Sequence, residues 1–127
     1  MEYDDFLLAK QFRDNPTGIT EIPELNAMMK PFQHDITTWA LRRGRACIFA
    51  DCGMGKTFMQ LEWARCVPGD VLIVAPLAVS DQTIREGIKF GIPGIEYSGD
   101  GIKRGKITIT NYEPYCSSHY QPYSMEA

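Results

Sequence analysis

Residues 50–57, Ala-Asp-Cys-Gly-Met-Gly-Lys-Thr, carry the groups that could bind a chain of phosphates. They match the phosphate-binding loop pattern GxxxxGK(S/T), with Ala50 in the place of the first glycine. Glycines let the backbone curl so that successive N–H groups point at phosphate oxygens, and the positive end of a following helix adds to the attraction. The ammonium group of Lys56 would reach the β- and γ-phosphates, and the hydroxyl of Thr57 would hold Mg²⁺.

We therefore predict a nucleotide site in which Lys56 and Thr57 are also the catalytic residues. The loop residues predicted to bind the nucleotide are Asp51, Cys52, Gly53, Met54, Gly55, Lys56 and Thr57. The alternative is a glycine-rich turn with a surface lysine. The flanking segments argue against that alternative, because a phosphate-binding loop follows a strand and opens a helix. Residues 45–50 form a short apolar run that predicts a parallel strand covered on both faces, and residues 56–67 predict a helix.

The rest of the chain alternates helical and strand patterns. Helices are predicted at residues 3–12, 31–43 and 79–90, and strands, of which the first is fully buried, at 71–74, 94–97 and 106–111. Pro31 suits a first helical turn, and Gly44 suits a helix end. Strands that alternate with helices predict an α/β fold with a parallel sheet, in which ligands bind at the carboxyl ends of the strands.

Length and composition indicate one small soluble domain. The chain has 127 residues, of which 44% are hydrophobic and 23% charged, and no apolar run approaches the roughly 20 residues of a membrane span. Its first residues are acidic where a signal peptide would be basic, so we expect a cytoplasmic location, in a cell or in a viral host. The four cysteines form no CxxC pair and are expected to be free thiols.

The formal net charge of −3 argues against nucleic-acid binding by the whole surface, so any such contact must be local. Two basic clusters could supply it. One lies at residues 42–45 and includes Arg43, and the other lies at residues 103–106 and includes Lys103. The alternative for each cluster is a solvated turn beside a strand.

Four segments, in order, resemble motifs of the first motor domain of superfamily 2 helicases and translocases, nearest to the Swi/Snf-type branch and its small phage-encoded relatives. Residues 30–33, Lys-Pro-Phe-Gln, resemble the adenine-recognition motif, and residues 51–57 resemble motif I. Residues 74–77, with Gln82 and Glu86, resemble motif Ia. Residues 110–113, Thr-Asn-Tyr-Glu, resemble the motif Ib region, which approaches the nucleic-acid backbone in the family.

The resemblance implies part of a RecA-like P-loop NTPase domain at residues 30–113, a helical extension at 1–29 and an irregular tail at 114–127. It implies ATP and Mg²⁺ as ligands, and DNA as the partner of the complete motor. Gln33 would read adenine, because a carboxamide offers the donor and acceptor that match N7 and N6 of the base. The residues that could contact nucleic acid are Pro76, Thr110, Asn111, Arg43 and Lys103.

Two features of the family are absent from this sequence. The family has a buried strand that ends in an Asp-Glu pair, which serves Mg²⁺ and the attacking water. Here residues 71–74 run into Ala-Pro and residues 107–110 into Asn-Tyr, and Glu113 is not a convincing substitute. The second motor domain is also missing.

We therefore expect the ATP-binding portion of an ATP-dependent DNA helicase or translocase, truncated before its catalytic acid, with negligible hydrolysis by the chain alone. The alternative is a non-motor P-loop nucleotide-binding module, or an interaction protein that keeps the loop as part of its fold. The oligomeric state stays open.

Overall fold

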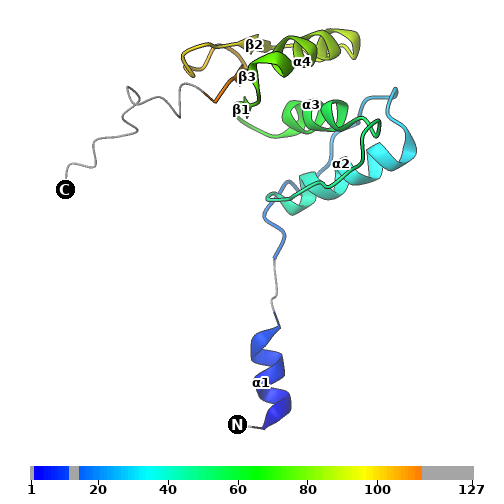
Figure 1. Cartoon of the computed structure of the whole chain (residues 1–127). Coiled ribbons are helices and arrows are strands. Elements are labelled where there is room, and N and C mark those ends of the chain that lie inside the picture. Colours follow the sequence, from blue (N-terminus) through cyan, green and yellow to red (C-terminus); the bar gives the residue numbers. More distant parts are fainter. Residues whose placement is uncertain (1, 12–14, 113–127) are drawn as a thin grey trace, which may run out of the picture.

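The computed structural model describes residues 2–11 and 15–112, which form four helices and three strands (Figure 1). The helices are α1 (Tyr3–Lys10), α2 (Pro31–Arg43), α3 (Lys56–Cys66) and α4 (Leu77–Lys89), and the strands are β1 (Val71–Val74), β2 (Ile95–Tyr97) and β3 (Ile107–Thr110). The bounds of α2 and β1 are those predicted, and the bounds of the other elements differ from prediction by one or two residues.

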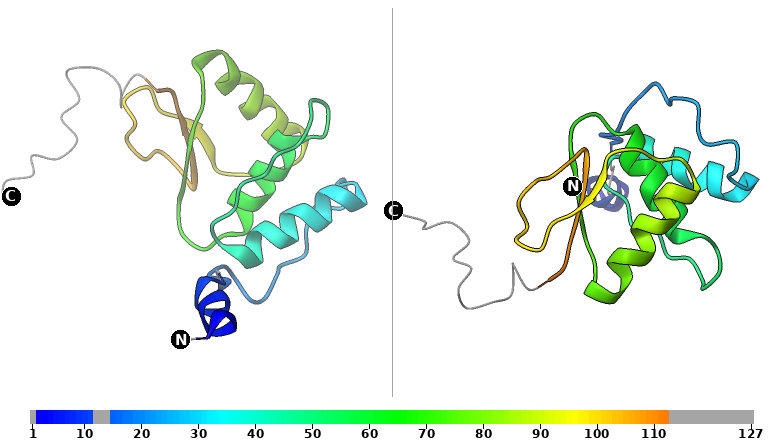
Figure 2. Two further views of the ribbon diagram at one scale, coloured as in Figure 1. Left: turned by 60° about the horizontal axis from the view of Figure 1, so that its bottom comes forward. Right: turned by 90° about the horizontal axis from the view of Figure 1, so that it is seen from above.

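The three strands form one parallel sheet in the order β1-β3-β2. Val71 of β1 and Ile95 of β2 both pair with Ile107 of β3. Helix α4 connects β1 to β2, and Figure 2 shows α3 and α4 next to each other beside the sheet. The predicted α/β fold, a parallel sheet flanked by helices, is confirmed.

β3 occupies the centre of the sheet, and all four of its residues are buried. The strand alternates isoleucine with threonine, so the two residue types point to opposite faces. The isoleucines join the hydrophobic core with Phe58 and Leu61 of α3. Phe58 also stacks on Phe90 at the end of α4, with ring centroids 3.7 Å apart. The core thus ties α3 and α4 to one face of the sheet.

The prediction of a strand before the phosphate-binding loop is wrong. Residues 46–50 have no regular secondary structure. Phe49, which belongs to the strand predicted to be covered on both faces, is 95% exposed. A strand needs a neighbour to take its peptide hydrogen bonds, and the sheet among the described residues ends at β1. Full burial of β1 is also wrong, because Leu72 and Val74 are exposed. Both corrections concern the end of the sheet that β1 forms.

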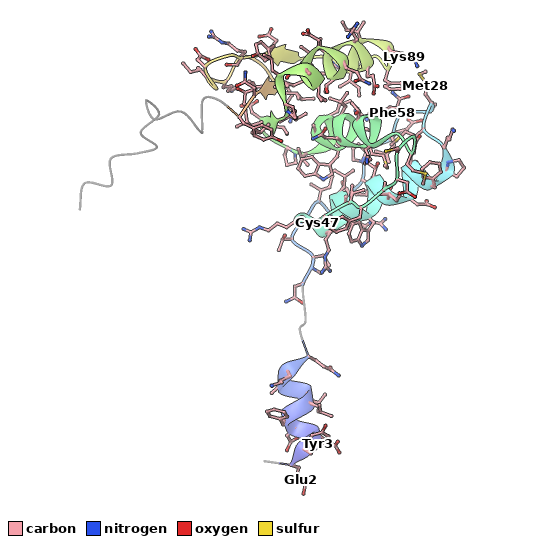
Figure 3. The ribbon with its side chains drawn as sticks, in the orientation of Figure 1. Glu2, Tyr3, Met28, Cys47, Phe58 and Lys89 are labelled. Atoms are coloured by element: carbon pink, nitrogen blue, oxygen red, sulfur yellow. The ribbon has the colours of Figure 1, made fainter. Side chains whose placement is uncertain are left out.

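The N-terminal helix contributes nothing to the core. No side chain of α1 is buried, and Figure 3 shows α1, with Tyr3 labelled, apart from the other helices. No helix in the described part of the chain has the length and apolar character needed to cross a membrane.

The remaining sequence predictions concern the cysteines, the C-terminal tail and the domain bounds. Cys47, Cys52 and Cys66 are free thiols, as expected, whereas Cys116 lies outside the described residues. Glu113 and the predicted tail at 114–127 also lie outside the described residues. The division of the chain at residues 29/30 and 113/114 stays a prediction.

Candidate functional site

Residues 51–55 form a tight loop that leads into α3. The N–H of Met54 donates to the C=O of Asp51 at 3.3 Å. Gly53 and Gly55 have φ angles of 82° and 76°, in the left-handed region that other residues rarely adopt. Gly55 is the N-cap of α3, and its C=O accepts a hydrogen bond from the N–H of Met59 at 3.1 Å. Both glycines therefore stand where the backbone requires them.

Gln33 of α2 holds this loop from one side. Its side chain is buried, and its Oε1 accepts a hydrogen bond from the N–H of Lys30 at 2.9 Å. Its Nε2 donates to the C=O of Met54 at 3.0 Å. The first contact caps α2 and the second fixes the loop. A side chain at residue 55 would collide with Nε2 of Gln33, so glycine there allows the close approach as well as the φ angle.

The contacts of Gln33 leave room for the adenine role predicted for it. A carboxamide has two N–H donors and two acceptor lone pairs. The N–H of Lys30 and the C=O of Met54 use one acceptor and one donor. One donor and one acceptor remain, which is the pair that adenine requires. Reading of adenine by Gln33 stays a prediction, beside the structural role that the contacts give it.

Lys56 and Thr57 lie in the first turn of α3, at the positive end of the helix. Nζ of Lys56 donates to the C=O of Ala50 at 2.8 Å, so the side chain folds back over the loop. The first N–H groups of a helix have no acceptor within it and can donate to an anion. A β-carbon at Gly53 would meet nothing within 4 Å, so this part of the loop is open.

These donors fit a polyphosphate with its magnesium ion. The ammonium group of Lys56, the hydroxyl of Thr57 and the free N–H groups of the first helical turn converge on one end of α3. Asp51, Cys52 and Met54 are exposed on the same loop. All seven predicted loop residues are thus adjacent in the structure, with Gln33 against them.

The predicted nucleic-acid residues fall into two groups. Pro76 is the exposed N-cap of α4, at the carboxyl end of β1. Thr110 ends β3 and Asn111 follows it, and the C=O of Thr110 accepts a hydrogen bond from the N–H of Ala75 at 3.0 Å. These three residues share the carboxyl edge of the sheet. The side chains of Thr110 and Asn111 are buried, and Nδ2 of Asn111 donates to the hydroxyl of Tyr97 at 3.1 Å.

Lys103 and Arg43 lie elsewhere. Lys103 forms an ion pair with Asp70, in the turn before β1, and Nζ of Lys106 donates to the C=O of Val67 at 2.7 Å. Both lysines therefore serve the amino ends of the strands, opposite to the edge that carries Pro76. Arg43 ends α2, and its C=O accepts from the N–H of Thr17 at 3.1 Å.

The segment between β2 and β3 is organised around one carboxylate. Asp100 accepts a hydrogen bond from the hydroxyl of Ser98 at 2.6 Å and from the N–H of Ile102 at 3.0 Å, and it pairs with Arg104 at 3.1 Å. The hydrogen bond from Ser98 is the main reason why the pKa of Asp100 lies below its usual value, followed by that from Ile102.

Sequence reasoning missed Glu62, which is fully buried in α3. Its Oε1 accepts hydrogen bonds from Nε of Arg65 at 3.0 Å and from the N–H of Asn26 at 3.2 Å. Nδ2 of Asn26 in turn donates to the C=O of Phe90 at 2.8 Å, so the segment before α2 is fixed to both α3 and α4. The hydrogen bond that Arg65 donates to Glu62 raises the pKa of Arg65. The spacing of Glu62 and Arg65, three residues apart on a helix, is the signal that could have indicated the pair.

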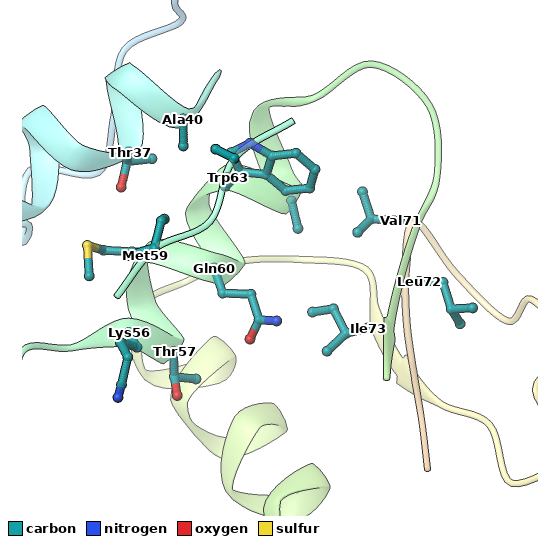
Figure 4. A pocket seen from close by; sticks show the side chains of 13 residues that line it. Thr37, Ala40, Lys56, Thr57, Met59, Gln60, Trp63, Val71, Leu72 and Ile73 are labelled. Carbon is teal, nitrogen blue, oxygen red and sulfur yellow. The ribbon is translucent and has the colours of Figure 1, made fainter. Parts of the chain in front are cut away.

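A cavity of ≈ 400 Å³ adjoins the first turn of α3 (Figure 4). Lys56 and Thr57 lie at one end of it, and residues of β1 together with Ala46 and Ile48 also line it. None of the residues 51–55 lines it, so it is distinct from the loop itself.

Comparison with known proteins bears on the fold. No family of known sequences matches the chain, and no curated protein matches it. The crystal structure of the UvsW helicase from bacteriophage T4 superposes with a TM-score of 0.58 and 19% sequence identity. The superposition covers 87% of this chain and 42% of UvsW, so the chain spans less than half the length of that protein. The fold is therefore helicase-like and matches part of a RecA-like domain.

Proposed function

We propose that this chain binds Mg-ATP through residues 51–57, as the nucleotide-binding part of a nucleic-acid helicase or translocase of superfamily 2, with Swi/Snf-type motifs. The observation that carries the proposal is the contact between Gln33 and Met54, because it joins the predicted adenine-recognition segment to the phosphate-binding loop. A glycine-rich surface turn would not need a buried glutamine from another helix to fix it.

Each loop residue has a part in the proposed binding. Lys56 exchanges the C=O of Ala50 for phosphate oxygens, which gives its ammonium group an ionic partner in place of a neutral one. The N–H groups at the start of α3 donate to the same phosphates. The hydroxyl of Thr57 would coordinate Mg²⁺, and the ion would neutralise charge on the β- and γ-phosphates. Gln33 offers its remaining donor and acceptor to adenine.

Nucleic-acid binding is the second half of the proposal. The carboxyl edge of the sheet carries Pro76, Thr110 and Asn111, and ligands of parallel α/β folds bind at this edge. The name of UvsW as a helicase agrees with it. Since the side chains of Thr110 and Asn111 are buried, contacts there would come from backbone groups and from α4. Lys103 pairs with Asp70 at the other edge and contributes little.

Thermal unfolding with and without Mg-ATP tests the binding proposal. A ligand at a hundredfold excess over its dissociation constant stabilises the protein by about 2.7 kcal/mol. Lys56→Ala removes a charge-assisted contact worth about 1.5–3 kcal/mol, so we expect affinity to fall at least tenfold. Lys10→Ala is the matched control, because Lys10 lies on α1, where no side chain is buried. Equal stabilisation of wild type and Lys56→Ala would remove the assignment.

Phosphate release on the same samples separates binding from turnover. We propose that the chain alone hydrolyses ATP negligibly, because β1 and β3 both run into residues without a carboxylate. A carboxylate is needed to orient the attacking water. DNA-stimulated turnover that Lys56→Ala abolishes would contradict this part and leave the binding site in place.

A further inference from the structure

Asn26, shortly before α2, has all four of its polar groups in hydrogen bonds. Its Oδ1 accepts from the N–H of Met28 at 3.0 Å, and its C=O accepts from the N–H of Met29 at 3.1 Å. Its N–H donates to Oε1 of Glu62 at 3.2 Å, and its Nδ2 donates to the C=O of Phe90 at 2.8 Å. The first two bonds form a turn that leads into α2, and the other two attach this turn to α3 and to the end of α4.

The turn that Asn26 forms leads directly to the residues that hold the phosphate-binding loop. Lys30 follows Met29 and is the N-cap of α2. The N–H of Lys30 donates to Oε1 of Gln33, and Nε2 of Gln33 donates to the C=O of Met54. The position of the Gln33 carboxamide therefore depends on where the turn at Asn26 is attached.

α3 carries both the phosphate-binding groups and the anchor of Asn26. Lys56 and Thr57 lie in its first turn, and Glu62 is fully buried near its middle. A helix rises about 1.5 Å per residue, so Glu62 lies about 9 Å beyond Lys56 along the same rigid element. Residues 26–33 are thus attached at two separate points, the loop before α3 and the middle of α3. Two attachment points fix the orientation of a segment as well as its distance.

Glu62 is not explained by stability alone. Its carboxylate is fully buried and pairs with Arg65, whose Nη2 also donates to the C=O of Glu24 at 3.0 Å. Replacing a buried ion pair with apolar residues of similar volume is often neutral or stabilising. Hydrogen bonds, in contrast to apolar contacts, require narrow ranges of distance and angle. Since Oε1 of Glu62 accepts from both Asn26 and Arg65, these bonds restrict where the segment before α2 can lie on α3.

We propose that Asn26, held in place by Glu62, is a positioning residue for Gln33 and fixes its carboxamide against the phosphate-binding loop in the orientation that adenine requires. Asn26 would act through Gln33 and not on the nucleotide itself. The statement about adenine rests on the proposed function, whereas the placement of Gln33 rests on the hydrogen bonds alone. Asn26 should therefore affect the preference for ATP over GTP.

Nucleotide preference tests the inference with the full chain. Dissociation constants of Mg-ATP and Mg-GTP are measured for wild type and for Asn26→Ala, and we expect the preference for ATP to fall about two- to tenfold. Partial unfolding of a variant lowers its apparent affinity for both nucleotides by the same factor, so a loss of stability alone does not change their ratio. Ile109→Val, in the core strand β3, is the matched destabilised control and should leave the ratio unchanged.

Substitutions at Glu62 and Gln33 test the route of the effect. Glu62→Gln keeps an oxygen that can accept from the N–H of Asn26 and should retain the preference, whereas Glu62→Leu removes the acceptor and should lower it as Asn26→Ala does. In a Gln33→Ala background, Asn26→Ala should cause no further loss, because two residues that act through one contact are not additive.

Hydrogen exchange tests the placement of Gln33 without any nucleotide. The amide of Lys30 donates to Gln33, so it should exchange about tenfold faster in Asn26→Ala than in wild type. The amide of Gly44, which donates to the C=O of Ala40 at the other end of α2, should exchange at the same rate in both. Faster exchange at Lys30 alone would show that the turn is released while α2 stays folded.

The outcomes separate this inference from the proposed function. Unchanged exchange at Lys30 would overturn the inference, and so would a preference for ATP that Gln33→Ala lowers but Asn26→Ala does not; the proposed function would stand in both cases. A further loss on adding Asn26→Ala to Gln33→Ala would show another route and also overturn the inference. Faster exchange at Lys30 in a protein that binds ATP and GTP equally would keep the placement of Gln33 and remove its adenine role from the proposed function.

Discussion

β3 and residues 46–50 are both short segments without charged residues, but they differ in what lies beside them. β3 has a parallel neighbour on each side, and all four of its residues are buried. Residues 46–50 have no strand beside them among the described residues, and Phe49 is 95% exposed. The difference follows from hydrogen bonding, since peptide groups without partners gain nothing from leaving water.

The comparison shows that an apolar run needs neighbouring strands or helices to bury it, and that the run itself does not specify those neighbours. β3 meets the requirement with β1, β2 and the helix α3. Residues 46–50 have no such neighbours, and Leu72 and Val74 of the edge strand β1 are exposed as well. We therefore expect the stability of the fold to depend on β3 and its neighbours, and residues 46–57 to be organised mainly by local contacts and by Gln33.

Substitution in the two segments tests this expectation most directly. Ile109→Ala removes a fully buried side chain of β3 and should lower the free energy of unfolding by about 2–5 kcal/mol. Phe49→Ala removes a larger side chain but should change the free energy by about 0.5 kcal/mol or less, because Phe49 is exposed. Urea unfolding of both variants measures the difference. A cost for Phe49→Ala as large as that for Ile109→Ala would mean that residues 46–50 are packed in solution.

Gln33→Ala tests the tie between the loop and the rest of the fold. The variant loses the cap of α2 and the bond to Met54, so we expect a loss of about 1–2 kcal/mol in the free energy of unfolding. The ATP preference over GTP should also fall, while triphosphate binding stays measurable. Gln82→Ala on the exposed face of α4 is the control, and it should change neither quantity. A stability loss with unchanged preference would leave Gln33 a structural role alone.

Local signals in the sequence predicted much of the fold. Pro31 and Gly44 bound α2 as predicted, because each residue type favours the backbone conformation that its position requires. Gln33 contacts the glycine-rich loop through the C=O of Met54, as the order of the motifs implies. The resemblance to helicases agrees with a fold match at 19% identity.

The remaining features depend on contacts between distant parts of the chain. The order of the strands decides that β1 is an edge, and nothing within residues 71–74 reports it. Lys103 was a candidate for nucleic-acid contact because it lies in a basic cluster, and its ion pair with Asp70, far away in sequence, is visible only in the structure. A charged residue such as Glu62 is expected at the surface from the sequence, whereas the structure buries it against Asn26 and Arg65. The contacts of Lys103 with Asp70 and of Glu62 with Asn26 join distant parts of the chain, so they cannot be worked out from one segment at a time.

The smallest expected effect concerns the segment that joins β2 to β3, whose side chains make the contacts that residues 46–50 lack. Ser98 and Ile102 donate to Asp100, and these bonds favour its ionised form, so the pKa of Asp100 is lowered. A carboxyl whose pKa is lower in the folded state stabilises the fold above its unfolded pKa of about 3.9, and this contribution disappears as pH falls through the folded pKa. Ser98→Ala should raise the pKa of Asp100 toward its usual value.

Carbon NMR of the Asp100 carboxyl between pH 2 and pH 6 measures the shift directly. Unfolding of wild type and Ser98→Ala should differ in stability near pH 6, and the part of that difference due to Asp100 should vanish as pH falls through the folded pKa of Asp100, where the carboxyl becomes protonated in the folded as well as in the unfolded protein. The difference should be small, because Asp100 is exposed and solvent screens its charge. Ser80→Ala, whose hydroxyl contacts Pro76 instead, should leave the titration of Asp100 unchanged. An unaltered titration of Asp100 in Ser98→Ala would show that the hydrogen bond from Ser98 does not hold this segment. The contrast with residues 46–50 would then depend on β3 alone.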